Sequence, residues 1–177
     1  NTPVPYTVSW TSEDHHYVAP CTYFSGRPAL SQPSSPGIGK PSFGKPHSQR
    51  QREAIAHCLC DLCGKSLKPH TKVSLSHARP VPHGADGWAV LQVEPMLHRA
   101  CAALCIEWCP SLKRDVANGT LFVRQVTRWR AQAAIMSREY VREVTGQDCT
   151  ALGHAKVELL RWLDRDLAWL KKAKASE

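Results

Sequence analysis

The chain has 177 residues, 42% of them hydrophobic, and a formal net charge of +8. This length suits one domain, or a small domain with extensions. No stretch approaches the roughly 18 apolar residues of a membrane helix, and no signal-peptide pattern is visible. The composition therefore excludes a membrane-spanning helix and predicts a soluble, cytoplasmic protein. The positive charge favours an acidic partner, of which nucleic acid is the commonest.

Residues 1–47 are predicted to form an extended N-terminal arm. Two runs, YTVSW and HHYVAP, are rich in β-branched and aromatic residues and indicate short strands. Residues 25–47 contain so many Pro, Gly and Ser residues that we expect neither helix nor strand there. This connector is either a flexible linker or an arm packed on the later domain, with Leu30, Ile38 and Phe43 as apolar anchors.

Residues 48–112 are predicted to form the main folded unit. The run SQRQ is a capping box, so a helix is expected to begin at Ser48, with the Ser48 hydroxyl and the Gln51 side chain exchanging hydrogen bonds with the backbone. KVSLSH and GWAVLQV indicate two strands, arranged like a hairpin and separated by a loop rich in Pro and Gly. A helix is then expected from about Leu97 until Pro110 stops it.

Residues 113–177 are predicted to pack a basic strand and C-terminal helices on the same core. TLFVRQVTRWR is expected to be a half-buried strand, with Leu121, Val123 and Trp129 on the face opposite its arginines. SREYVREVTG indicates a short helix capped by Ser137 and closed by Gly146.

The C-terminal run HAKVELLRWLDRDLAWLKKAKA contains neither Gly nor Pro. Its leucines recur at helical spacing, which predicts a long amphipathic C-terminal helix. The part KVELLRW is also compatible with a strand.

Six of the eight cysteines lie in two short segments, CLCDLC and RACAALCIEWC. A turn carrying Cys60 and Cys63 presents two sulfurs to one point, and Gly64 permits the tight turn that follows. If a helix starts near Leu97, His98 and Cys101 lie on one of its faces and supply two more ligands. The order of knuckle, hairpin and helix predicts an α+β fold with a treble-clef-like core around a structural zinc ion.

The remaining cysteines near this site leave two interpretations open. Cys58, Cys105 and Cys109 could form a second metal site together with His57. The favoured interpretation is that they are small apolar residues that pack the helix against the hairpin.

The segment KVSLSHARPV resembles the strand of HNH nucleases that carries their general-base histidine. His77 would take that role here. Ser76 stands where those enzymes have an acid, and the turns after Cys101 lack a second cation ligand. A nuclease is therefore a disfavoured alternative, and the question of enzyme activity stays open, with a non-enzymatic role favoured.

Residues 39–112 carry a Cys-x-x-Cys-Gly knuckle followed by Pro-x-x-His-x-x-Cys-Ala and a closing Cys-Pro. This combination resembles a group of small, functionally uncharacterised actinobacterial and bacteriophage proteins. The resemblance implies ligand roles for Cys60, Cys63, His98 and Cys101, and it implies no particular activity.

The predicted function is a zinc-stabilised, nucleic-acid-binding accessory or regulatory protein. Four basic residues are the candidates for phosphate contact, namely Arg124, Arg128, Arg130 and Arg138. Trp129 between two of them could stack on a base. The alternative is an adaptor that binds a host or partner protein, or a second copy of itself, through the leucine stripe of the C-terminal helix.

Overall fold

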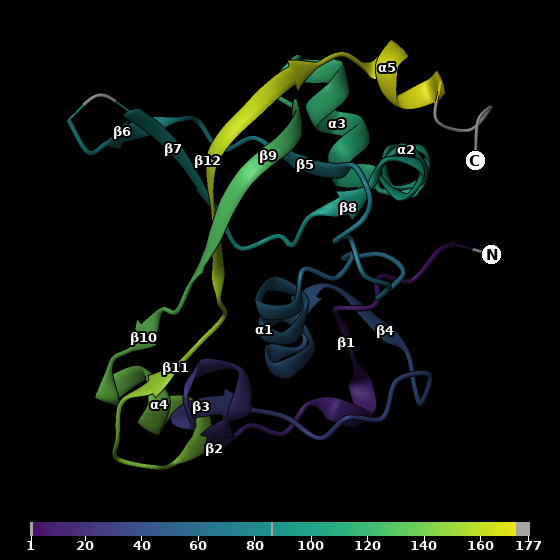
Figure 1. Ribbon diagram of the computed structural model, residues 1–177. Coiled ribbons are helices and arrows are strands. Elements are labelled where there is room, and N and C mark those ends of the chain that lie inside the picture. Colours follow the sequence, from purple (N-terminus) through teal and green to yellow (C-terminus); the bar gives the residue numbers. More distant parts are fainter. Residues whose placement is uncertain (1, 86, 173–177) are drawn as a thin grey trace.

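The computed structural model describes residues 2–85 and 87–172 and combines helices with three β-sheets, which agrees with the α+β prediction (Figure 1). The largest sheet is antiparallel throughout and has the order β6-β7-β12-β9-β5-β8. Its strands are β5 (Lys72–Ser76), β6 (Val81–His83), β7 (Gly87–Gln92), β8 (Leu97–His98), β9 (Phe122–Gln132) and β12 (Lys156–Arg165).

Two smaller sheets hold the N-terminal strands. In the first, β1 (Val8–Trp10) pairs with β4 (Pro41–Pro46). The second has the order β10-β11-β3-β2, in which β11 and β3 are parallel. Its strands are β2 (Tyr17–Cys21), β3 (Arg27–Ser31), β10 (Ile135–Met136) and β11 (Ala151–Leu152). In Figure 1 the long strands β9 and β12 run from the large sheet toward this smaller one.

The prediction that residues 25–47 contain no strand is wrong, because β3 and β4 both lie there. β3 pairs with β2 and β11, and β4 pairs with β1, all of which lie outside residues 25–47. These partners supply the backbone hydrogen bonds that the segment cannot form within itself. Of the three predicted anchors, Leu30 is buried, whereas Ile38 and Phe43 are 61% and 56% exposed.

The helices are α1 (Ser48–His57), α2 (Arg99–Trp108), α3 (Pro110–Asn118), α4 (Arg138–Thr145) and α5 (Leu167–Lys171), with 3-10 turns at Thr11–Glu13 and Thr22–Phe24. The predicted caps of α4 are confirmed, since Ser137 accepts a hydrogen bond from the Tyr140 N–H and Gly146 has a φ of 76°. α2 ends before Pro110 as predicted. The same proline then opens α3, where its missing N–H costs nothing.

α1 begins at Ser48 as predicted, but the predicted capping box does not form. The N-cap is His47, whose Nδ1 accepts from the Arg50 N–H, while the Ser48 hydroxyl donates to Gln32. The Gln51 side chain is fully buried and bonds the backbone of Val93 and Ala155 instead. A tertiary contact has replaced the local one because the first turn of α1 is packed inside the protein.

The predicted long C-terminal helix is wrong. Residues 156–165 form β12 at the centre of the large sheet, and the helical part is limited to the five residues of α5. Pairing with β7 on one side and β9 on the other outweighs the helical spacing of the leucines. The alternative assignment of KVELLRW to a strand is the correct one.

The predicted hairpin of KVSLSH and GWAVLQV is also wrong, although both runs are strands. β12 and β9 lie between β5 and β7 in the sheet, and β7 makes its hairpin with β6. β5 pairs with β8, the strand that leads into α2, and this pairing brings the metal-ligating segments together.

The main core lies between the large sheet and the helices α2 and α5, with Val73, Leu159, Ala102 and Leu170 among its buried side chains. None of the helices in residues 2–85 and 87–172 is long and apolar enough to cross a bilayer.

Candidate metal centre and basic surface

The segment after α1 folds into a tight turn that carries Cys60 and Cys63. The Cys60 N–H donates to the Lys65 carbonyl at 2.8 Å, and the Gly64 N–H donates to the Cys60 carbonyl at 2.9 Å. Gly64 has a φ of +70°, which glycine adopts without strain. The turn therefore has the form predicted for a zinc knuckle, with both sulfurs directed to one side.

β8 and the first turn of α2 supply the other two side chains. His98 is the N-cap of α2, and Cys101 lies three residues later in the first turn. His98 Nε2 lies 3.1 Å from the Ser66 carbonyl. Since a carbonyl can only accept, Nε2 carries the proton, and Nδ1 keeps a free lone pair on the side of the sulfurs.

The four predicted ligands meet in one group. The Sγ atoms of Cys60, Cys63 and Cys101 and a ring nitrogen of His98 all lie within 4.8 Å of one another. His98 Nδ1 is 3.4 Å from Cys63 Sγ. Zn–S distances of about 2.3 Å and Zn–N distances of about 2.0 Å imply tetrahedral ligand separations of roughly 3.5–3.8 Å. The arrangement therefore fits a single small metal ion.

The surroundings of Cys60 favour its anionic form, which a metal ligand requires. The pKa of the Cys60 thiol is lowered, chiefly by a hydrogen bond from Cys101 and also by backbone N–H groups, which outweigh the effect of burial. The His98 N–H donates to Cys60 Sγ at 3.4 Å. The pKa of Cys101 is raised by the same shared proton. A divalent cation would replace that proton.

The N-terminal segment covers the knuckle, a contact that the sequence does not reveal. A Cβ added to Gly64 would lie only 2.8 Å from the nearest carbon of the Tyr6 ring. The ring therefore occupies the space that any larger residue would need. The Tyr6 N–H donates to the Leu62 carbonyl at 3.0 Å, and the Thr7 hydroxyl bonds the Asp61 carboxylate. Tyr6 and Thr7 therefore attach the N-terminal segment to the knuckle.

The group that could hold a metal contains none of Cys58, Cys105 and Cys109, and it is the one such group found in residues 2–85 and 87–172. Cys58 caps α1 in the left-handed region with a φ of 55°. Cys105 packs against the main core and its carbonyl accepts the Cys109 N–H at the end of α2. This placement supports packing roles for these cysteines.

Arg124 is removed from the predicted phosphate-binding set because it is only 1% exposed. Its guanidinium lies over the rings of Phe122 and Trp162. It donates to the Ser76 hydroxyl at 3.2 Å and to the Ala78 carbonyl at 2.7 Å. The alternating pattern of β9 had indicated a solvated face, but the rest of the sheet covers this end of the strand.

The other candidate arginines do not form one patch. Arg130 is bonded to the buried carboxylate of Glu158, which also contacts His83 and Gln132. Burial by itself would raise the pKa of Glu158, but Arg130 and Gln132 hold it below its ordinary value. Arg138 lies on α4, beside the smaller sheet. Arg128 and Arg138 are both exposed and outside every ion pair found among the described residues, but they lie on different elements, β9 and α4.

Arg128 has a neighbour that the sequence analysis missed. It is the register partner of Arg161 on β12, at a point where the ladder is irregular on both sides of Arg161, and both side chains are exposed. Like charges directly opposite in an antiparallel pair repel and destabilise the sheet. The only sequence signal for this contact is the strand assignment of KVELLRW, which brings residue 161 next to β9.

We expect Arg161→Gln to raise the free energy of unfolding by about 0.2–1 kcal/mol at low ionic strength, because it removes this repulsion. Denaturant titrations at 20 mM and 1 M NaCl measure the effect, and the gain should shrink at high salt. Arg142→Gln, which removes the exposed pair with Asp148, is the control with the same charge change and should give no gain. An equal gain in both variants would contradict the repulsion.

Several cations lie against tryptophan rings on the large sheet and the helices packed on it. Lys72 Nζ lies 5.1 Å from the centroid of the Trp129 ring. The Trp169 ring contacts both Arg99 and Arg165, at 4.2 and 5.2 Å. These side chains lie on β5, β9, β12, α2 and α5, so the large sheet and its helices carry most of the aromatic and basic contacts.

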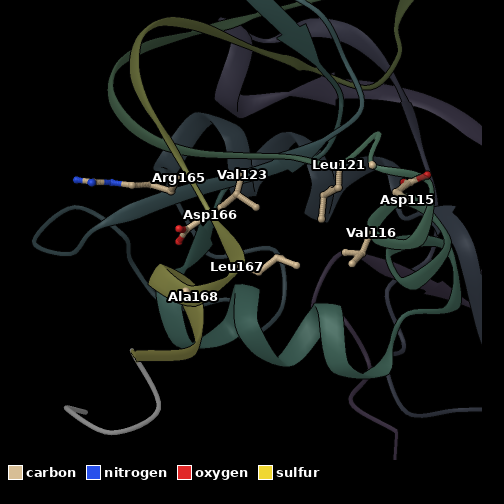
Figure 2. Close-up of a pocket in the computed structure, with 9 residues that line it drawn as sticks. Asp115, Val116, Leu121, Val123, Arg165, Asp166, Leu167 and Ala168 are labelled. Atoms are coloured by element: carbon tan, nitrogen blue, oxygen red, sulfur yellow. The ribbon is translucent and has the colours of Figure 1, made fainter.

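A cavity of about 470 Å³ lies between α3, β9 and α5 (Figure 2). Figure 2 shows Val116, Leu121 and Leu167 extending into it, with the guanidinium of Arg165 directed away. Its carboxylates have local roles: Asp166 caps α5 through the Trp169 N–H, and Asp115 accepts from Thr120. We therefore assign this cavity to packing.

His77 follows β5 and is exposed, and Ser76 beside it bonds Arg124. The role of His77 as a general base stays an untested, disfavoured prediction.

No protein-family model matches this chain, and comparison with curated proteins and with solved structures gives no match. The resemblance to small actinobacterial and bacteriophage proteins therefore stays a prediction, and the function is argued from the geometry.

Proposed function

We propose that this chain is a zinc-stabilised nucleic-acid-binding protein with an accessory or regulatory role. The observation that carries the nucleic-acid part is the exposed cross-strand pair of Arg128 and Arg161. The repulsion within this pair is relieved when an anion binds between the guanidinium groups, and a backbone phosphate is an anion that arginines bind through bidentate, charge-assisted hydrogen bonds.

The donor set supports zinc as the metal. Three thiolates and one imidazole in a tetrahedral arrangement are typical of structural zinc sites. All four coordination positions would be filled by protein, so the ion would stabilise the fold and leave no position for a substrate. Its binding free energy would contribute directly to folding.

Cation–aromatic contacts elsewhere on the large sheet and its helices suit a strand of nucleic acid better than a small anion. Lys72, Arg99 and Arg165 add positive charge and lie against the half-buried rings of Trp129 and Trp169. Cationic grooves with aromatic side chains are the usual means of binding single strands without sequence preference. Single-stranded DNA or RNA is therefore the favoured target.

The test is binding of fluorescein-labelled single-stranded and duplex DNA and RNA across a salt series. We expect single strands to bind, and we expect Arg128→Gln/Arg161→Gln to reduce the slope of log affinity against log salt by about 2. The matched control is Arg138→Gln/Arg142→Gln on α4, which removes the same charge away from the pair and should change the slope much less. Absence of binding at 50 mM salt, or equal losses in the two double variants, would overturn the proposal.

The adaptor alternative loses its predicted surface, since the leucine stripe is not on one helix. A protein partner and homodimerisation stay predictions without a defined surface.

A further inference from the structure

A second cavity, of about 380 Å³, lies between the N-terminal strands and α4. Its walls come from β1, β4, the segment after β3, α4 and the residues before β12, and none of the metal ligands takes part. The volume falls in the range of about 300–1,000 Å³ that is usual for small-molecule sites. The function proposed above makes no use of this cavity.

The lining residues combine aromatic rings with ionisable groups. Trp10 and Tyr140 supply an indole and a phenol. Lys45, His16 and His154 supply a cation and two imidazoles, and Asp14 supplies one carboxylate. The ion pairs found among the described residues hold none of these four ionisable side chains. Ionisable side chains outside ion pairs, set beside aromatic rings, are typical of a site that orients a ligand.

His154 is held by the protein on one side. Burial lowers the pKa of His154, while a hydrogen bond to the Pro46 carbonyl has the opposite effect and Arg52 adds to the lowering. At neutral pH one ring nitrogen donates to Pro46, and the other is able to accept a hydrogen bond from a ligand.

A buried positive charge lies behind the same wall. Arg52 is 1% exposed and donates to the carbonyl of Gly153, a residue that lines the cavity. Its Nε has no hydrogen-bond partner, and the acidic groups that interact with it are Cys21 and Tyr23, which are both weak acids. A buried guanidinium without a carboxylate is costly, and an anion in the adjoining cavity reduces that cost.

We propose that this cavity binds a nucleoside monophosphate unit, with the base against Trp10 and Tyr140 and the phosphate toward Lys45 and His16. Asp14 and the free ring nitrogen of His154 would accept hydrogen bonds from a ribose hydroxyl or an exocyclic amine. Aromatic rings hold the base by stacking, and the Lys45 ammonium and an N–H of His16 hold the phosphate. The ligand is either a free nucleotide or the phosphorylated end of a strand, since both offer the same chemistry.

The experiment is isothermal titration of the metal-loaded full chain with AMP, GMP, CMP and UMP, and with adenosine, inorganic phosphate and a 5′-phosphorylated hexanucleotide. We expect at least one monophosphate to bind, and the matching nucleoside and phosphate alone to bind at least tenfold more weakly. Lys45→Gln and Tyr140→Ala should each weaken that nucleotide by about tenfold or more. Lys45 and Tyr140 are exposed, so neither change threatens folding.

Arg142→Gln is the control, because Arg142 shares α4 with Tyr140 but pairs with Asp148 and does not line the cavity. Arg128→Gln/Arg161→Gln separates the two proposals, since it should leave monophosphate binding unchanged even if strand binding is lost. Binding of the hexanucleotide more tightly than the monophosphate identifies a strand end as the source, and the reverse identifies a free nucleotide. The proposal is overturned if no monophosphate binds, if phosphate alone binds as tightly, or if the nucleoside does.

Discussion

Cys101→Ser is expected to lower the thermal midpoint more than a serine substitution at any cysteine outside the metal-ligating group. Cys101 would connect the first turn of α2 to the knuckle through the metal, and loss of one thiolate would weaken the whole site. Structural zinc supplies about 10–16 kcal/mol of apparent binding free energy in small domains, which equals or exceeds the net stability of about 5–15 kcal/mol of a typical protein. Thermal unfolding followed by circular dichroism measures the effect.

A chelator provides the second measurement. We expect the purified protein to contain one zinc ion per chain, and a zinc chelator to lower the midpoint of the wild-type protein and leave Cys101→Ser almost unchanged. Cys149→Ser is the matched control, because Cys149 is half-buried and outside the metal-binding group. A wild-type midpoint that is indifferent to the chelator, with no stoichiometric metal present, would contradict the metal centre.

Glu13→Gln is expected to destabilise the protein by about 3–5 kcal/mol, since it leaves a buried guanidinium without its partner. Both carboxylate oxygens of Glu13 contact Arg50 at 2.8 Å, and they also accept from the backbone N–H groups of Trp10 and Ser35. Arg50 in turn donates to the carbonyls of Tyr6 and Val8. This pair ties the N-terminal strands to α1.

Denaturant unfolding measures the loss, with Asp14→Asn as the control because the neighbouring Asp14 is exposed and outside the ion pairs. The double variant Glu13→Gln/Arg50→Met should recover part of the stability, because it removes the stranded charge. A loss as small as that of Asp14→Asn would show that the pair contributes nothing.

The same pair predicts how stability depends on pH. Burial alone would raise the pKa of Glu13, but hydrogen bonds from Arg50, Trp10 and Ser35 lower it from 4.5 to about 2. The folded-state pKa is therefore below the unfolded value, so the contribution is complete above about pH 4.5 and is lost as the pH falls toward 2. The free energy of unfolding of Glu13→Gln should fall less steeply over this pH range than that of the wild-type protein. The metal-ligand candidates titrate in both proteins, so the difference between the two curves reports Glu13.

The metal-ligating residues could be predicted because their geometry depends on short stretches of chain. Two residues between Cys60 and Cys63 set the turn, and three residues of helix set the relation of His98 to Cys101. The cap of α4 at Ser137 and the break at Pro110 are equally local. Each of these features results from backbone geometry within four residues, and tertiary packing did not alter it.

The basic surface could not be predicted in the same way. The pattern of β9 places Arg124 on a polar face, but the Trp162 ring and the hydrogen bonds to Ser76 and Ala78 bury it there. Arg130 is neutralised by Glu158, which is 28 residues away in sequence. The exposed pair depends on β12 lying beside β9, and the helical spacing of the leucines concealed that strand.

By itself, the sequence determined the α+β class, the four side chains that lie together and could hold a metal ion, and the positive charge of the chain. The tertiary structure alone decided that β12 separates β5 from β7, that Glu13 reaches Arg50, and that Arg128 faces Arg161. The reason is that strand pairing and charge burial depend on segments far apart in the chain. Which strands pair and which charges are buried depends on the surfaces that pack together in the folded chain, and a local sequence pattern does not predict that packing.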